Sequence, residues 1–164
     1  MKDKLKVLSL ELLDANITIG TAEHCTSGLL GASISSMCGV SSVYKGTIVA
    51  VDEERMEKLL DVSHNVFTNN GLVSSQVACQ MAIGGVYALN VDVCVAIVGN
   101  VNPNDGNENH IVWICVATRQ EKKVDFKYKK INVNGLRGQN IETAINEALD
   151  VTLEEITRIT TSEE

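Results

Sequence analysis

The sequence predicts an α/β protein, a three-layer α/β/α sandwich built on a mixed, mostly parallel sheet. Helical and strand patterns alternate along the chain, and no repeat or Pro/Gly/Ser-rich linker interrupts them. Two crossover helices and one hairpin are expected, which gives a sheet covered on both faces. With 164 residues, 45% of them hydrophobic, the chain fits a single domain over residues 1–164.

The first half of the chain is predicted to contain three helices and two strands. Leu5, Leu8 and Leu12 recur at helical spacing, so a first helix is expected before Asn16. The elements that follow are a short buried strand at 17–22, a helix of small apolar residues at 25–37, a second strand at 44–51 and a short charged helix at 52–60.

The second half is predicted to contain one helix, three strands and a long final helix. Ser74 is a suitable N-cap for a helix that ends near Asn90, before an apolar strand at 91–98. Residues 99–110 include Pro103, which is the only proline, and several asparagines, so they are expected to form a loop. The remaining elements are two antiparallel strands at 111–118 and 124–133, joined by a turn at Gln120-Glu121, and a helix at 139–159.

The charge distribution argues against nucleic acid and membrane partners. The net charge is −7, and basic residues cluster only at Lys122-Lys123 and at 127–130, where they alternate with apolar residues as on a solvated sheet edge. The chain begins with charged helical sequence and contains no apolar stretch near the ~20 residues of a membrane span. We therefore expect a soluble protein without a signal peptide.

The cysteines and histidines do not form a recognisable metal site. Five cysteines without a C-x-x-C pair are typical of reduced thiols, so a cytoplasmic location is expected. His24, His64 and His110 lack ligand spacing on one element. We expect neither a metal nor a cofactor.

Three segments are candidates for a ligand site because they lie where predicted strands end or the last helix begins. In chain order they are residues 21–28, residues 99–103 and residues 135–137. Taken separately, they could be a helix cap, an irregular turn and a solvated arginine. In the first segment, free N–H groups at the strand-to-helix turn could receive an anion, and in the third an arginine could bind a phosphate. We expect all three to meet at one cleft whose ligand-binding residues are Glu23, His24, Cys25, Thr26, Gly99, Asn100, Asn102 and Arg137.

Together these segments resemble the C-terminal domain family of CinA-type competence- and damage-inducible proteins, and the resemblance covers nearly the whole chain. Residues 21–28 are similar to the family run Thr-Ala-Glu-Ser-Cys-Thr-Gly-Gly and differ at His24 and Ser27. Residues 99–103 replace the family loop Gly-Ile-Ala-Gly-Pro with Gly-Asn-Val-Asn-Pro, which indicates a remodelled pocket. Residues 135–137 are similar to a closing Gly-Asp-Arg.

The resemblance implies an amidohydrolase that removes the amide of nicotinamide mononucleotide and releases ammonia. The family's serine nucleophile corresponds to His24, and the lysine that accepts its proton corresponds to Met56. Methionine accepts no proton, Arg55 stays charged, and Lys58 would point about 200° around a helix from Met56. Loss of a nucleophile and its base costs on the order of 10⁶ in rate. We therefore predict a catalytically deficient protein that binds a nucleotide or a partner.

The alternative is an active amide hydrolase that acts on a pyridine nucleotide with altered residues. Cys25 is the candidate nucleophile, because a helix N-terminus could lower the pKa of its thiol and the imidazole of His24 is adjacent in sequence. The family resemblance also implies a homo-oligomer.

Overall fold

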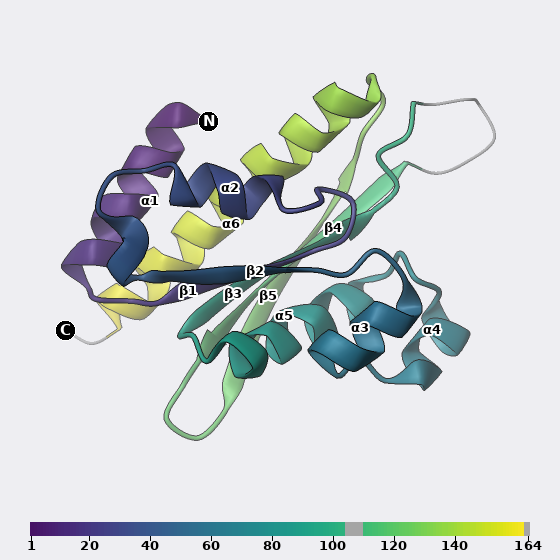
Figure 1. Cartoon of the computed structure of the whole chain (residues 1–164), viewed down its shortest axis with the longest axis horizontal. Coiled ribbons are helices and arrows are strands. Elements are labelled where there is room, and N and C mark those ends of the chain that lie inside the picture. Colours follow the sequence, from purple (N-terminus) through teal and green to yellow (C-terminus); the bar gives the residue numbers. More distant parts are fainter. Residues whose placement is uncertain (104–109, 163–164) are drawn as a thin grey trace.

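The computed structural model describes residues 1–103 and 110–162, and within these ranges it contains one five-stranded sheet (Figure 1). The strands are arranged in the order β2-β1-β3-β4-β5. Their bounds are β1 Ile19–Glu23, β2 Tyr44–Val49, β3 Val93–Gly99, β4 Ile111–Arg119 and β5 Val124–Asn132.

The sheet is mixed, as predicted. β1 pairs in parallel with β2 and β3, whereas β3 with β4 and β4 with β5 form antiparallel pairs. Four of the five strands in the described sheet therefore run in the same direction, and only β4 opposes them. The carboxyl ends of β1, β2 and β3 lie at one edge of the sheet, where residues following these strands can meet.

Helices cover both faces of the sheet, which confirms the predicted three layers. α1, α2 and α6 pack on one face, and α3, α4 and α5 lie on the other (Figure 1). Their bounds are α1 Lys2–Asp14, α2 Leu29–Ser35, α3 Glu53–Leu60, α4 His64–Asn70, α5 Ser75–Leu89 and α6 Arg137–Thr161.

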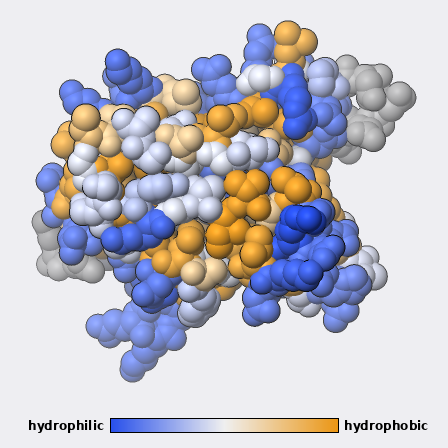
Figure 2. Space-filling view, in the orientation of Figure 1, coloured by the Kyte–Doolittle hydropathy of each residue, from blue (hydrophilic) through white to orange (hydrophobic). Residues whose placement is uncertain are grey.

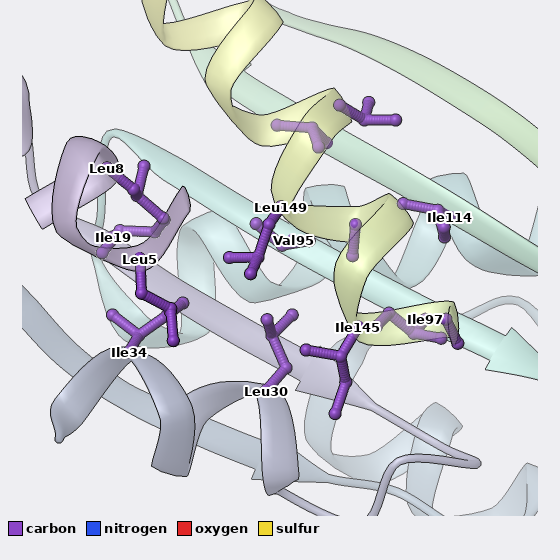
Figure 3. Close-up of a cluster of buried hydrophobic side chains, with 14 of the residues drawn as sticks. Leu5, Leu8, Ile19, Leu30, Ile34, Val95, Ile97, Ile114, Ile145 and Leu149 are labelled. Atoms are coloured by element: carbon purple, nitrogen blue, oxygen red, sulfur yellow. The ribbon is translucent and has the colours of Figure 1, made fainter. Parts of the chain in front are cut away.

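The central strand β3 supplies both halves of the core because its side chains alternate between the two faces. All seven of its residues are buried, as predicted for a strand covered on both sides. Val95 and Ile97 face α1, α2 and α6, where Figure 3 shows them beside Leu30, Ile145 and Leu149. The residues that face the opposite helices are Cys94, Ala96 and Val98.

The structure differs from the sequence prediction at two helices. α2 begins at Leu29 and not at Cys25, because Ser27 and Gly28 adopt left-handed backbone conformations, with φ of 51° and 92°, and end the turn that precedes the helix. α4 was not predicted, since Phe67 is its only fully buried residue and the segment lacks an apolar period. A short 3₁₀ turn at Val40–Ser42 also precedes β2.

The two edges of the sheet have different surfaces. On β5, Lys127 and Lys129 pair with Glu154 and Glu147 of α6 at 2.7 and 2.6 Å, which fits the predicted solvated edge. Figure 2 shows hydrophobic side chains gathered over the region where β2 leads into α3, and Val51 there is 51% exposed. In the described ranges no helix has the length and apolar character that crossing a bilayer requires.

Candidate functional site

The turn between β1 and α2 is built around the buried carboxylate of Glu23. Its Oε2 accepts hydrogen bonds from the Thr26 hydroxyl at 2.6 Å and from the N–H groups of Gly28 and Leu30 at 2.9 and 3.2 Å. Its Oε1 accepts from the N–H of Gly31 at 2.7 Å and from a threonine hydroxyl of β1 at 2.9 Å. The carboxylate therefore ties the end of β1 to the start of α2.

This network corrects two expectations drawn from the sequence. The N–H groups at the start of α2 already bind Glu23, so they are not free to receive a ligand anion. Glu23 and Thr26 have no exposed surface. In this structure they hold the turn in position from the interior of the protein. Neither side chain has an atom that a ligand in the cleft could contact.

His24 follows Glu23 and is fixed between β1 and β3. Its N–H donates to the Ile97 carbonyl at 2.9 Å, and its Nδ1 accepts from the N–H of Gly99 at 3.3 Å. Burial lowers the pKa of His24, and the nearby charge of Arg137 lowers it further. An acceptor Nδ1 requires the neutral tautomer that carries its proton on Nε2, so the imidazole offers the cleft a hydrogen-bond donor.

The loop after β3 is attached to the start of α6 by Asn140, whose side chain is buried. Asn140 Nδ2 donates to the carbonyls of Val101 at 3.1 Å and Gly135 at 3.0 Å, and its Oδ1 accepts from the N–H of Gly135 at 2.8 Å. Gly99 itself cannot carry a side chain, because a Cβ would lie 2.7 Å from the Cα of Val112. These contacts set the position of the loop against Arg137, the first residue of α6.

The three predicted segments meet at a cleft of about 420 Å³. Of the residues expected to bind a ligand, it is lined by His24, Cys25, Gly99, Asn100, Asn102 and Arg137. The other lining residues are Ser27, Val51, Val73 and Val101. Among these described lining residues Arg137 is the only ionised side chain, and its Nη1 donates to Oδ1 of Asn102 at 2.5 Å. The cleft is therefore suited to an anionic ligand.

Cys25 lies in the cleft wall but lacks the properties of a nucleophile. Its side chain is 6% exposed, and burial raises the pKa of the thiol to about 12. The helix that was expected to lower this pKa begins four residues later, at Leu29. Because the thiolate is the reactive form, a thiol with this pKa is inert near neutral pH.

Met56 lies outside the set of residues that line the cleft. It is fully buried in the apolar cluster between α3, α4 and α5, with Leu60 and Phe67. The neighbouring cations Arg55 and Lys58 are exposed and pair with acidic residues of the same segment, at 2.5 Å with Asp52 and 2.6 Å with Glu54. Neither cation is positioned to accept a proton in the cleft.

Ser27 is a hydroxyl in the cleft that the sequence reasoning did not select. A serine becomes a nucleophile when a neighbouring base accepts its proton. The free nitrogen of His24 is the protonated Nε2, which cannot serve as that base, and no described residue of the cleft wall replaces it. The described residues of the cleft wall are suited to binding by hydrogen bonds, and none of them is an activated nucleophile.

A second hollow, of about 680 Å³, lies between α3 and α5 and is larger than the cleft. It is lined mainly by apolar groups such as Leu59, Ile83 and Tyr87, and the side-chain amide of Gln80 in its wall already accepts a hydrogen bond from the N–H of Ser63. The smaller cleft is the better candidate because it joins the carboxyl ends of β1 and β3 to a cation and several amides.

Asn140 was also missed by the sequence reasoning. The available signal was an asparagine near the start of a helix, close to the apolar positions that face the sheet, where a polar side chain requires partners. Its partners are backbone groups 5 to 39 residues away, and these become visible only in the folded chain.

Comparison with known proteins identifies relatives over most of the chain. The family model of the CinA C-terminal domain matches residues 2–156. A CinA-like protein of Dictyoglomus turgidum is 36% identical over 139 residues, which cover 82% of this chain and 33% of that protein. A protein of Mycoplasma pneumoniae is 38% identical over 127 residues, which cover 76% of this chain and 80% of that protein. The chain thus corresponds to about a third of the CinA-like relative.

Solved structures support the same fold. A CinA superfamily protein from Klebsiella pneumoniae superposes with a TM-score of 0.86 at 19% identity, covering 95% of this chain and 97% of the other. The competence/damage inducible protein CihA from Agrobacterium tumefaciens also gives a TM-score of 0.86, at 22% identity and 93% coverage of both chains. At these identities the similarity describes the fold alone.

Proposed function

Because the chain belongs to the CinA C-terminal domain family, we propose that it binds a pyridine nucleotide in this cleft and does not hydrolyse the nucleotide's amide. The observation that carries the proposal is the composition of the cleft. It contains one arginine, a neutral histidine that donates a hydrogen bond, and amide side chains, without an activated nucleophile among its described residues.

The binding part of the proposal is supported by Arg137. A guanidinium recognises a phosphate oxygen pair through parallel hydrogen bonds, and no described carboxylate lines the cleft to compete for it. The carboxylate of Glu23 is buried beneath the turn and accepts five hydrogen bonds there, so it does not face the guanidinium from the cleft wall. A nucleotide phosphate fits this wall, whose described residues carry one positive charge and no negative one.

The catalytic part of the proposal is supported by His24 and Met56. His24 stands where the family resemblance implies a serine, and its free nitrogen carries a proton. Met56 stands where the resemblance implies a lysine, and it is fully buried in apolar surroundings. Without both partners the proton transfer that activates the hydroxyl has neither a donor nor an acceptor.

The alternative, an amide hydrolase that uses Cys25, is disfavoured by the burial of the thiol and its raised pKa. Ammonia release from nicotinamide mononucleotide distinguishes the two hypotheses. We expect no release above a buffer control, and release that disappears in Cys25→Ala would establish the thiol mechanism in place of our proposal.

Binding is tested by thermal shift with nicotinamide mononucleotide and nicotinic acid mononucleotide. A ligand at 100 times its dissociation constant adds about 2.7 kcal/mol of stability. We expect a concentration-dependent shift in the wild-type protein that is lost in Arg137→Gln. If neither nucleotide shifts the transition at millimolar concentration, the binding function is refuted.

Three further expectations also belong to this proposal. We propose that residues 1–164 act as one domain, that the protein works in the cytoplasm, and that it forms a homo-oligomer. Light scattering of the purified chain tests the last of these, and a monomeric mass at micromolar concentration would contradict it.

A further inference from the structure

The cation that lines the cleft already has a partner there. Arg137 Nη1 donates to Oδ1 of Asn102 at 2.5 Å, across the gap between the start of α6 and the loop after β3. The sequence contains three other arginines, and each of them pairs with a residue outside the cleft. The contact with Asn102 therefore involves the one guanidinium that is available to a ligand in the cleft.

Asn102 cannot easily move away with the arginine, because its backbone is fixed. Its N–H donates to Oδ1 of Asn100 at 3.1 Å, and its carbonyl accepts from Nδ2 of Asn140 at 3.4 Å. Asn140 is 2% exposed and also holds the carbonyl of Val101. The asparagine is thus anchored, and the long exposed arginine side chain is the partner that adjusts.

We propose that Asn102 is an affinity-determining residue: its side-chain amide holds Arg137 in place, and the hydrogen bond between them has to break when a ligand phosphate binds at the Nη1 end of the guanidinium. This inference deepens the nucleotide-binding function and rests on it. We call the hydrogen bond between Arg137 Nη1 and Asn102 Oδ1 the Arg137 latch.

Bidentate recognition explains why the latch opposes phosphate. A guanidinium offers five N–H donors in a planar fork, and a phosphate uses two parallel donors from one side of the fork. The latch occupies Nη1, so a phosphate that approaches the Nη1 and Nη2 end competes directly with the amide. An alanine or glycine at position 102 has no group that could compete. Since both side chains are exposed, we expect the latch to weaken phosphate binding by about two- to fivefold.

The latch is tested without any ligand by ¹⁵N NMR of the arginine side chains. The chain has four arginines, so the signal of Arg137 is assigned by its disappearance in Arg137→Gln. In the wild-type protein we expect slowed rotation and a shifted Nη1 resonance, and in Asn102→Ala we expect the values of a free guanidinium. An Arg137 signal that is identical in the two proteins would overturn the latch.

The effect on the affinity for phosphate is tested by isothermal titration calorimetry with inorganic phosphate. Asn102→Ala should bind phosphate two- to fivefold more tightly than the wild type. The same change in an Arg137→Gln background should have no effect, because there is no guanidinium left to release. Asn65→Ala is the matched control, since Asn65 is an exposed asparagine on α4, away from the cleft.

The two measurements separate the possible failures. Equal phosphate affinity in the wild type and Asn102→Ala, with binding that depends on Arg137, would refute the role of Asn102 and leave the nucleotide-binding function standing. Absence of phosphate binding by both proteins would refute the affinity role, and the thermal shift with the two mononucleotides would separately decide the binding function. The Arg137 resonance would then still decide whether the contact itself exists in solution.

Discussion

Replacing Glu23 with glutamine is expected to destabilise the protein by about 3 kcal/mol. The carboxylate accepts five hydrogen bonds, and the NH₂ group of glutamine would face donors at either oxygen position. In the better orientation the NH₂ faces the N–H of Gly31, which leaves one buried donor unpaired at a cost of about 1–3 kcal/mol. The bonds at the other oxygen also lose their charge assistance, about 1 kcal/mol each, and the lower desolvation cost of a neutral amide offsets part of this loss.

Urea denaturation followed by circular dichroism measures this change. For a chain of this length about 3 kcal/mol corresponds to a decrease in Tm of about 6–12 °C. The matched control is Glu121→Gln, an exposed residue outside the network, for which we expect a change within about 0.5 kcal/mol. If Glu23→Gln loses less than about 1 kcal/mol with an unchanged m-value, the carboxylate does not organise the turn and the reasoning is wrong.

Three further predictions concern the cleft and its surroundings. In the folded protein a thiol reagent at neutral pH should modify Cys38, which is the exposed cysteine, and leave Cys25 unmodified; rapid labelling of Cys25 would contradict its burial. Because the pKa of His24 is lowered in the folded protein, the unfolded chain binds more protons, and the free energy of unfolding should fall as pH decreases below about 6.5. His24→Gln should reduce the dependence of this free energy on pH, measured by denaturation curves from pH 7.5 to 5. The pair His24→Ser and Met56→Lys should not restore ammonia release, because position 56 is buried in the apolar cluster outside the cleft and its amine would not reach the new hydroxyl; release by the double variant and by neither single variant in a single-turnover assay would show that the two positions still act as a unit.

The layers of the fold could be predicted from the sequence because they depend on local periodicity. β3 was recognised by its unbroken apolar run, and α5 by the helical pattern that starts at the N-cap Ser74 and ends at the left-handed Asn90. These signals lie within one element and need no knowledge of the neighbours. α4 was missed because a short helix with one buried side chain has no such period.

The cleft was predictable in outline and less so in detail. Its segments follow from the rule that ligands bind at the carboxyl ends of parallel strands, and six of the eight expected ligand-binding residues line it. The roles of Glu23 and Asn140 could not be read from the sequence, since both depend on partners that the fold brings to them. In the sequence, the N–H groups at the start of a helix are expected to be available to a ligand anion. In the structure they donate instead to the carboxylate of Glu23.

The same separation explains how a chain could keep its cleft under the proposed function, in which the residues that hold the cleft differ from those that the resemblance implies for catalysis. The cleft walls are held by Glu23 and Asn140, and none of their hydrogen bonds involves the side chains of His24 or Met56. A lysine at position 56 would place an amine in a fully buried apolar cluster, where desolvation opposes its charge, whereas burial of methionine there contributes about 1.5–3 kcal/mol. Methionine at position 56 therefore stabilises the scaffold more than a lysine would, and it leaves the walls of the cleft unchanged. The proposed binding function is consistent with this arrangement, because a methionine at position 56 reduces neither the stability of the scaffold nor the access of a ligand to the cleft.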